Sequence, residues 1–289
     1  MFQKNNMNSK LTTTDHSRDA AGLQYVYPVL SRRAGGLSVG INFNTNNACN
    51  WRCIYCQVPG LVRGSAPELD LALLEEELRV FLQDVLQGDF YERFQVPGEL
   101  RQIRDIAISG NGEPTSSRQF SPAVDLIGRV MQEVLGQDAC PFVLISNGSL
   151  MHRAEVQEGL QQLQGHGGQV WFKIDSATPE GRRLVNHAAI SRQNVVDNLL
   201  LSAKLCPTWL QTCLIDLDDR DFMIRERRAY LQLLSEILEK TTLQGVLLYT
   251  LARPSQQPEA ERLVKVPPEE LHDFARQIRA LDIPVKVSL

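Results

Sequence analysis

The chain has 289 residues, of which 43% are hydrophobic and 22% are charged, and its formal net charge is −4. No apolar run approaches the roughly 20 residues needed to span a bilayer, which argues against an integral membrane protein. The negative net charge argues against a dedicated nucleic-acid surface, but it leaves room for a local basic patch.

The chain begins with a polar stretch, MFQKNNMNSKLTTTDHSRDA, that lacks the apolar region of a signal peptide. We expect residues 1–24 to form a flexible polar segment and residues 25–289 to form a single core domain with a short C-terminal extension. Six cysteines in a chain without a secretory signal do not predict a disulfide framework. Three of them lie in one loop, which favours a reducing, cytoplasmic location.

Strand-like and helix-like segments alternate along the chain. A strand at 37–43 precedes the cysteine-rich loop and a helix within 67–88. A strand at 103–109 precedes a helix at 121–136, with Ser121 expected as its N-cap and Pro122 as its first residue. The pattern then repeats, with strands expected at 141–148, 169–175, 208–216 and 245–254, helices at 152–165, 178–187, 191–205, 225–240 and 267–281, and a strand-like tail at the end.

Six such β/α units predict parallel strands joined by right-handed crossovers, in an open sheet or a barrel. In both architectures ligands bind at the carboxyl ends of the strands. Polar residues do follow the six strands. They are the cysteine loop, SGNGEPT, SNG, KIDSA, DLDD and ARP, in chain order.

The cysteine loop, NNACNWRCIYCQVPG, spaces Cys49, Cys53 and Cys56 as CxxxCxxC. Thiolates are soft ligands that select zinc, copper or iron–sulfur clusters. A zinc site would need a fourth ligand, and the nearest histidines, His16 and His152, do not lie in a metal-binding motif. A four-iron cluster held by three cysteines would keep one iron open to an external ligand. A structural zinc site is the alternative interpretation.

The loop, with Tyr55 just before its last cysteine, resembles that of the radical S-adenosylmethionine enzymes. The segment SGNGEP at 109–114 falls where that family carries a Gly-Gly-Glu-Pro-like motif, and SNG and FKIDS are similar to the family's polar exits from strands three and four. The resemblance covers residues 37–255. Within the superfamily, SVGINFNTNNACNWRCIYCQVPG, GNGEPT and YTLARP are most similar to the iron–sulfur oxidoreductases related to wybutosine synthesis enzymes.

This resemblance implies a (β/α)6 partial TIM barrel with parallel strands and two cofactors, a [4Fe-4S] cluster and S-adenosylmethionine. Cys49, Cys53 and Cys56 would bind three irons, and the amino and carboxylate groups of S-adenosylmethionine would chelate the fourth. Reductive cleavage of that cofactor would give a 5′-deoxyadenosyl radical, which abstracts hydrogen from the substrate. The reaction implies an external one-electron donor of the flavodoxin or ferredoxin type.

The resemblance also assigns a cofactor-binding turn after the second strand. Gly110, Asn111, Gly112 and Glu113 would line the side of the site that receives the amino group. Glycines let backbone approach a ligand closely, and a carboxylate matches an ammonium group. Asn111 stands where the commonest form of the motif has glycine, and asparagine tolerates left-handed backbone.

Further residues complete the expected cofactor site. Tyr55, Asn147 at the third exit, and Lys173 and Asp175 on the fourth strand are candidates to contact the cofactor, the last three at its ribose and carboxylate. Lys173 and Asp175 are two residues apart, so they point to one face of the strand, and a structural ion pair is their alternative role. Arg253 at the sixth exit is expected to meet an anionic substrate or the adenine edge.

The sequence does not identify the substrate, which could be a small molecule, a peptide or a nucleotide. An iron–sulfur electron-transfer or sensor protein that does not cleave S-adenosylmethionine is the second hypothesis, and a zinc-stabilised binding protein is the third. Cys140, Cys206 and Cys213 are expected to be free thiols outside the cluster. The first two would lie at the bottom of the barrel and Cys213 within the fifth strand.

Overall fold

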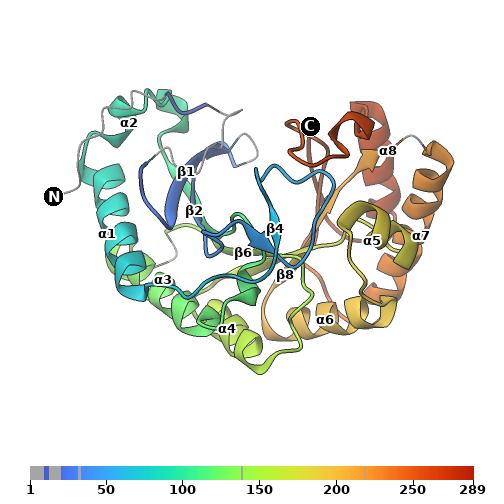
Figure 1. The fold of residues 1–289 in the computed structure, drawn as a ribbon, viewed down its shortest axis with the longest axis horizontal. Helices are drawn as coiled ribbons and strands as arrows, with labels where there is room; N and C mark the ends of the chain where they lie inside the picture. The colour runs from blue at the N-terminus through green and yellow to red at the C-terminus, as the bar shows by residue number, and fades with distance from the viewer. Residues whose placement is uncertain (1–9, 13–20, 32–33, 138, 218) are drawn as a thin grey trace.

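The computed structural model describes residues 10–12, 21–31, 34–137, 139–217 and 219–289 (Figure 1). Its strands are β1 (Val26–Ser31), β2 (Gly36–Ile41), β3 (Ala48–Cys49), β4 (Val62–Arg63), β5 (Ile103–Ile108), β6 (Phe142–Ser146), β7 (Gln169–Lys173), β8 (Thr208–Cys213), β9 (Ile215–Asp216), β10 (Gly245–Tyr249), β11 (Val264–Lys265) and β12 (Val285–Ser288). Its helices are α1 (Leu71–Gln87), α2 (Phe90–Arg93), α3 (Phe120–Leu135), α4 (Ala154–Gly165), α5 (Pro179–Asn186), α6 (Arg192–Leu205), α7 (Arg220–Leu238) and α8 (Pro268–Arg279).

One eight-stranded sheet organises the molecule, in the order β1-β2-β5-β6-β7-β8-β10-β12. All neighbouring strands pair in parallel except β1, which is antiparallel to β2. The sheet curls into a half-barrel, and α1, α3, α4, α6, α7 and α8 form an arc outside it (Figure 1). The predicted partial barrel with six parallel β/α units is therefore confirmed. The tail after the last helix is a seventh parallel strand, β12.

The starts of two helices differ from the prediction. Helix α3 begins at Phe120 with Gln119 as its N-cap, so Ser121 and Pro122 lie inside its first turn, where a missing N–H costs no hydrogen bond. The Gln119 side chain exchanges hydrogen bonds with the backbone of Leu69, which fixes this earlier start. Helix α7 begins at Arg220 rather than 225 because the Asp219 carboxylate caps it.

Two strands were also predicted to extend further than they do. The fifth predicted strand, 208–216, is divided into β8 and the short β9, and the sixth ends at Tyr249. The antiparallel strand β1 was not predicted at all. It contains Pro28, a residue that sheets accept mainly on edge strands, and β1 is such an edge.

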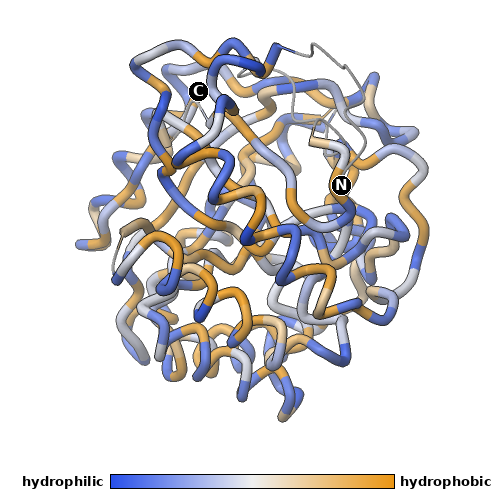
Figure 2. Tube along the Cα trace, turned by 90° about the vertical axis from the view of Figure 1, so that its left-hand side faces the viewer, coloured by the Kyte–Doolittle hydropathy of each residue, from blue (hydrophilic) through white to orange (hydrophobic). Residues whose placement is uncertain are grey.

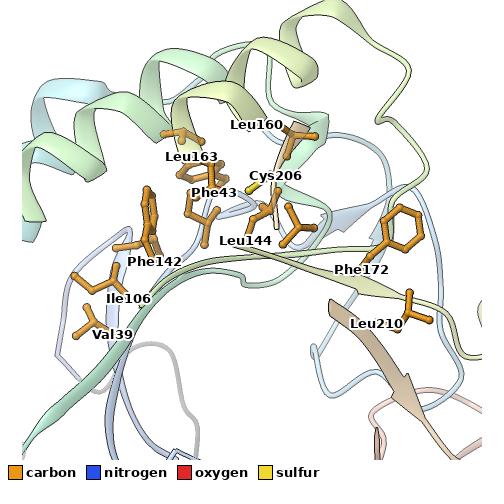
Figure 3. Close-up of a cluster of buried hydrophobic side chains, with 14 of the residues drawn as sticks. Val39, Phe43, Ile106, Phe142, Leu144, Leu160, Leu163, Phe172, Cys206 and Leu210 are labelled. Atoms are coloured by element: carbon orange, nitrogen blue, oxygen red, sulfur yellow. The ribbon is translucent and has the colours of Figure 1, made fainter. Parts of the chain in front are cut away.

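The main core lies between the outer face of the sheet and the helices. Strand side chains pack there against Leu160 and Leu163 of α4, and Cys206 lies in the same layer (Figure 3). Cys206 is 2% exposed and its thiol donates to the carbonyl of Gly168, so it is a buried structural thiol, as expected. The strand residues shown in this layer are Val39, Ile106, Phe142, Leu144, Phe172 and Leu210.

Hydrophobic and hydrophilic stretches alternate along the trace, as a two-faced sheet and amphipathic helices require (Figure 2). Among the described helices, none has both the length and the apolar character needed to cross a bilayer. The predicted flexible segment at 1–24 falls largely on residues outside the described ranges. Leu11 is described, and it is buried with its N–H donating to the carbonyl of Phe94.

Candidate functional site

A cavity of about 1500 Å³ follows the inner face of the sheet and reaches the loops at the strands' carboxyl ends. The structure brings nearly all of the predicted site residues to its wall. Asp175 is the exception, because it lies behind the wall in a hydrogen-bond network. The predicted residues that line the cavity are Cys49, Cys53, Tyr55, Cys56, Gly110, Asn111, Gly112, Glu113, Asn147, Lys173 and Arg253.

The cysteine loop starts and ends in a short parallel ladder, where β3 pairs with β4. All three cysteines are free of disulfide bonds, and as whole residues they are of intermediate exposure. Burial in surroundings of low polarity raises the pKa of Cys49 and of Cys53 to about 12. As free thiols these groups are therefore protonated at neutral pH, and a bound metal would displace their protons. In the described part of the chain, no three His, Cys, Asp or Glu side chains are grouped so that they could hold one metal ion.

Two distant segments support this loop through its backbone. On one side, the Ile54 N–H donates to Val185 at the end of α5, over 2.9 Å. On the other side, the Ser255 hydroxyl donates to the carbonyl of Ile54 over 2.7 Å, and the Gln256 N–H donates to the carbonyl of Cys56 over 2.9 Å. The loop is thus held between α5 and the segment that follows β10.

An ion pair joins the same three segments. Arg52 of the cysteine loop donates two hydrogen bonds to the Glu259 carboxylate, over 2.7 and 2.8 Å. His187, which follows α5, lies 2.6 Å from Arg52 and 3.2 Å from Glu259 through its Nε2. The hydrogen bonds from Arg52 lower the pKa of Glu259 to about 2, so this carboxylate is charged at neutral pH.

The turn after β5 packs directly against the cysteine loop. A Cβ on Gly112 would lie 1.9 Å from the carbonyl oxygen of Ala48, and a Cβ on Gly110 would lie 2.2 Å from the Asn42 side chain. The glycines therefore serve the packing of two protein segments. Asn111 donates its side-chain N–H to the Asn47 side chain over 2.6 Å, so this side chain faces the cysteine loop.

Glu113 is 2% exposed and accepts four hydrogen bonds from the protein. Two come from Thr115, one from the Ser146 hydroxyl and one from the Asn147 N–H. Burial raises the pKa of Glu113 above its ordinary value, although these hydrogen bonds act in the opposite direction. The carboxylate joins the exits of β5 and β6, a structural role that the sequence did not suggest.

Asn147 continues this connection to the cysteine loop. Its side-chain N–H donates to the Asn50 side chain over 2.8 Å, and its side-chain oxygen accepts from the N–H and hydroxyl of Ser149. Asn50 lies between the first two cysteines and donates in turn to the Ser149 hydroxyl. Asn147 therefore helps to position the loop as well as line the cavity.

Lys173 and Asp175 belong to one network through Tyr55. The Lys173 ammonium lies 5.1 Å from the centre of the Tyr55 ring and 3.2 Å from the Tyr249 hydroxyl, while the Tyr55 hydroxyl donates to Asp175. Burial is the largest single influence and acts to lower the pKa of Lys173, but Asp175 together with Tyr249, Cys53 and Cys213 raises this pKa well above its usual range. A positive charge is thus maintained on the cavity wall.

Asp175 is fixed by two further donors, the Asn186 side chain at 2.9 Å and the Cys213 N–H at 3.0 Å. Neither donor was predicted to belong to the site. Cys213 was expected only as a thiol within the fifth strand, yet it ends β8 and lines the cavity. Its spacing from the other cysteines carried no signal, because β7 and β8 bring it close only in the folded sheet.

No family model matches the chain. A UPF0026 protein of Helicobacter pylori is 24% identical over 230 residues, which is 79% of this chain and 66% of that protein. A second UPF0026 protein, from another strain, is 30% identical over 137 residues, or 47% of this chain and 38% of that protein. The GTPase Obg of Brachyspira hyodysenteriae is 28% identical over 135 residues, or 46% of this chain and 17% of that protein. The matched regions thus span less than two thirds of these curated relatives.

Solved structures resemble the whole half-barrel. A radical SAM methyltransferase from Sphaerobacter thermophilus superposes with a TM-score of 0.56 at 14% identity, over 88% of this chain and 66% of that chain. TYW1 with a lysine–pyruvate adduct bound gives 0.53 at 14%, over 86% and 74%. A variant of spore photoproduct lyase gives 0.56 at 11%, over 83% and 73%. The chain has the radical SAM fold. At these identities the likeness concerns the fold alone.

Proposed function

We propose that this protein is a radical SAM enzyme that binds a [4Fe-4S] cluster through Cys49, Cys53 and Cys56 and reductively cleaves S-adenosylmethionine to modify a substrate. One observation carries the proposal. The three thiols come from a single loop at the carboxyl ends of the strands and line the same cavity as the 110–113 turn, Lys173 and Arg253.

The residues present fit both cofactors. The donor set consists of three soft sulfur ligands on one loop, which suits iron and sulfide better than a hard cation. When bound, the cluster would pass on an electron received from the external donor, and S-adenosylmethionine would supply the 5′-deoxyadenosyl group. The maintained charge of Lys173 offers a partner for the carboxylate of the cofactor, and Arg253 offers one for an anionic group of cofactor or substrate.

The protein's own task in this proposal is to hold the loop and limit access of water. The contacts to Val185, Ser255 and Glu259 fix the loop on both sides. The Glu113 and Asn147 hydrogen bonds fix the turns that face it. The electron would come from an external one-electron donor of flavodoxin or ferredoxin type.

A single assay tests the proposal. The protein is purified without oxygen, reconstituted with iron and sulfide, and incubated with dithionite and S-adenosylmethionine, and 5′-deoxyadenosine is measured by mass-resolved chromatography. We expect the wild type to form it and Cys53→Ala to form none, because loss of one of three protein ligands removes the cluster.

Cys206→Ala is the matched control, since Cys206 is a buried thiol in the outer core. It should keep both cluster and product. An intact cluster in the wild type without 5′-deoxyadenosine would favour an electron-transfer or sensor protein instead. Stoichiometric zinc without iron after anaerobic purification from cells would favour a zinc-stabilised binding protein. Full activity of Cys53→Ala would refute the proposed role of this cysteine.

A further inference from the structure

Asn186 connects the cysteine loop to the network behind the cavity wall. It is the last residue of α5 and is 1% exposed. Its side-chain nitrogen Nδ2 lies 3.3 Å from the sulfur of Cys53 and 2.9 Å from the Asp175 carboxylate. An amide nitrogen carries two hydrogens, so it can donate to both partners at once.

The surroundings fix the orientation of this amide. The carbonyl of Asn186 accepts from the Arg52 N–H over 3.2 Å, which ties the helix end to the cysteine loop. The Oδ1 atom of Asp175 accepts from the Cys213 N–H, and its Oδ2 atom accepts from both the Tyr55 hydroxyl and the Asn186 side chain. A carboxylate accepts hydrogen bonds and cannot donate them, so the Asn186 NH₂ group, and not its side-chain carbonyl, faces Asp175. The same NH₂ group then also faces Cys53.

Cys53 differs in this respect from Cys49. The Cys49 sulfur accepts from the backbone N–H of Trp51, over 3.4 Å. Almost any residue at position 51 would provide the backbone N–H that faces Cys49. The donor to Cys53 is instead the side chain of Asn186, so it depends on the residue type at position 186. Hydrogen bonds to ligand sulfurs are one of the protein's means of setting the potential of an iron–sulfur centre.

We propose that Asn186 is a positioning residue that donates an N–H···S hydrogen bond to Cys53 and thereby raises the reduction potential of the cluster. The inference rests on the proposed function, because it requires Cys53 to be a cluster ligand. Reduction adds negative charge that is shared with the ligand sulfurs, so a donor at sulfur stabilises the reduced state more than the oxidised one. Asp175 acts in the opposite direction, and the Asn186 amide lies between this carboxylate and the sulfur.

Asn186→Leu tests the inference, because leucine has a similar volume and no donor. The midpoint potential of the reconstituted cluster is measured by anaerobic redox titration, followed by electron paramagnetic resonance of the reduced cluster. We expect a more negative potential, corresponding to about a tenfold smaller equilibrium constant for one-electron reduction, or about 59 mV. Iron and sulfide content should equal that of the wild type. Asn186→Ser, whose side chain is too short to reach both partners, should shift the potential in the same direction and replaces the leucine variant if that protein does not fold.

Asn198→Leu is the matched control. Asn198 is a similarly buried asparagine on α6, and its side chain donates to the carbonyl of Gly148 over 2.9 Å. The Asn198→Leu variant should have the same midpoint potential as the wild type. Equal potentials in the wild type and the Asn186 variants would overturn the inference, as would the same shift in Asn198→Leu. Loss of the cluster from both Asn186 variants would also overturn it, because the amide would then serve assembly. A wild type that binds no cluster would overturn the proposed function instead.

Discussion

At the scale of single residues, small polar and glycine positions determine how the site is packed. Glu113, Asn147 and Asn50 form a chain of hydrogen bonds from the exits of β5 and β6 to the cysteine loop. Gly112 lets the 110–113 turn contact that loop without a side chain between them. The sequence predicted Gly112, Glu113 and Asn147 as cofactor contacts and did not predict Asn50. Sequence spacing shows that two strand exits are neighbours, but it does not show which donor meets which acceptor.

Replacing Gly112 with alanine should destabilise the protein. The added Cβ would lie 1.9 Å from the Ala48 carbonyl oxygen, which is backbone and cannot move aside cheaply. We expect a loss of about 1–3 kcal/mol in the free energy of unfolding, as measured by urea titration of the cluster-free protein. Gly98→Ala is the control, since a Cβ there meets no atom within 4 Å. A stability of Gly112→Ala equal to that of Gly98→Ala would contradict the packing role.

At the scale of elements, the cysteine loop is held by the end of α5 and by the segment after β10. Arg52, His187 and Glu259 supply one side chain from each of the three. The contribution of Glu259 depends on pH. Because the folded-state pKa, about 2, is below the ordinary value of 4.5, its stabilisation is fully present above about pH 4.5 and is lost as the pH falls towards 2.

The variant Glu259→Gln should therefore lose stability at neutral pH and lose less in acid. We expect a deficit of about 0.5–1 kcal/mol at pH 7 that shrinks between pH 4.5 and pH 3, measured by urea unfolding across this range. Glu261→Gln changes an exposed carboxylate two residues further on and is the comparison. If the loss of unfolding free energy in Glu259→Gln stayed constant down to pH 3, the charge of Glu259 would not be the source of its stabilising effect.

At the scale of the whole molecule, the two faces of the sheet have different tasks. The outer face carries the core, whereas the inner face lines the cavity. Phe172 points outwards, is 1% exposed and packs on Gly148, where a Cβ would lie 2.0 Å from the ring. Phe172→Ala should cost about 3–5 kcal/mol of unfolding free energy in urea, against little change for Val80→Ala on the exposed side of α1. Similar losses of unfolding free energy in Phe172→Ala and Val80→Ala would contradict the assignment of the core to the outer face of the sheet.

The sequence predicted the fold because alternating periodicity specifies parallel pairing, and it predicted most of the cavity wall because parallel strands place their exits together. Strand β1 was missed because its pairing is set by contact with β2 rather than by alternation with a helix. Asn186, His187 and Glu259 were missed because each lies more than 120 residues from its partner in the cysteine loop, in no motif. Such contacts depend on the positions that α5 and the segment after β10 take in the folded protein.

The support of the cysteine loop from two sides has a consequence for how the protein is made. A growing chain that has just passed residue 64 already contains all three thiols and the β3–β4 ladder, but neither α5 nor the segment that carries Ser255 and Glu259. During synthesis from the N-terminus the loop therefore lacks part of its support until Ser255 and Glu259 have been made. If the loop binds a cluster as proposed, insertion before that point would meet a loop that only α5 supports.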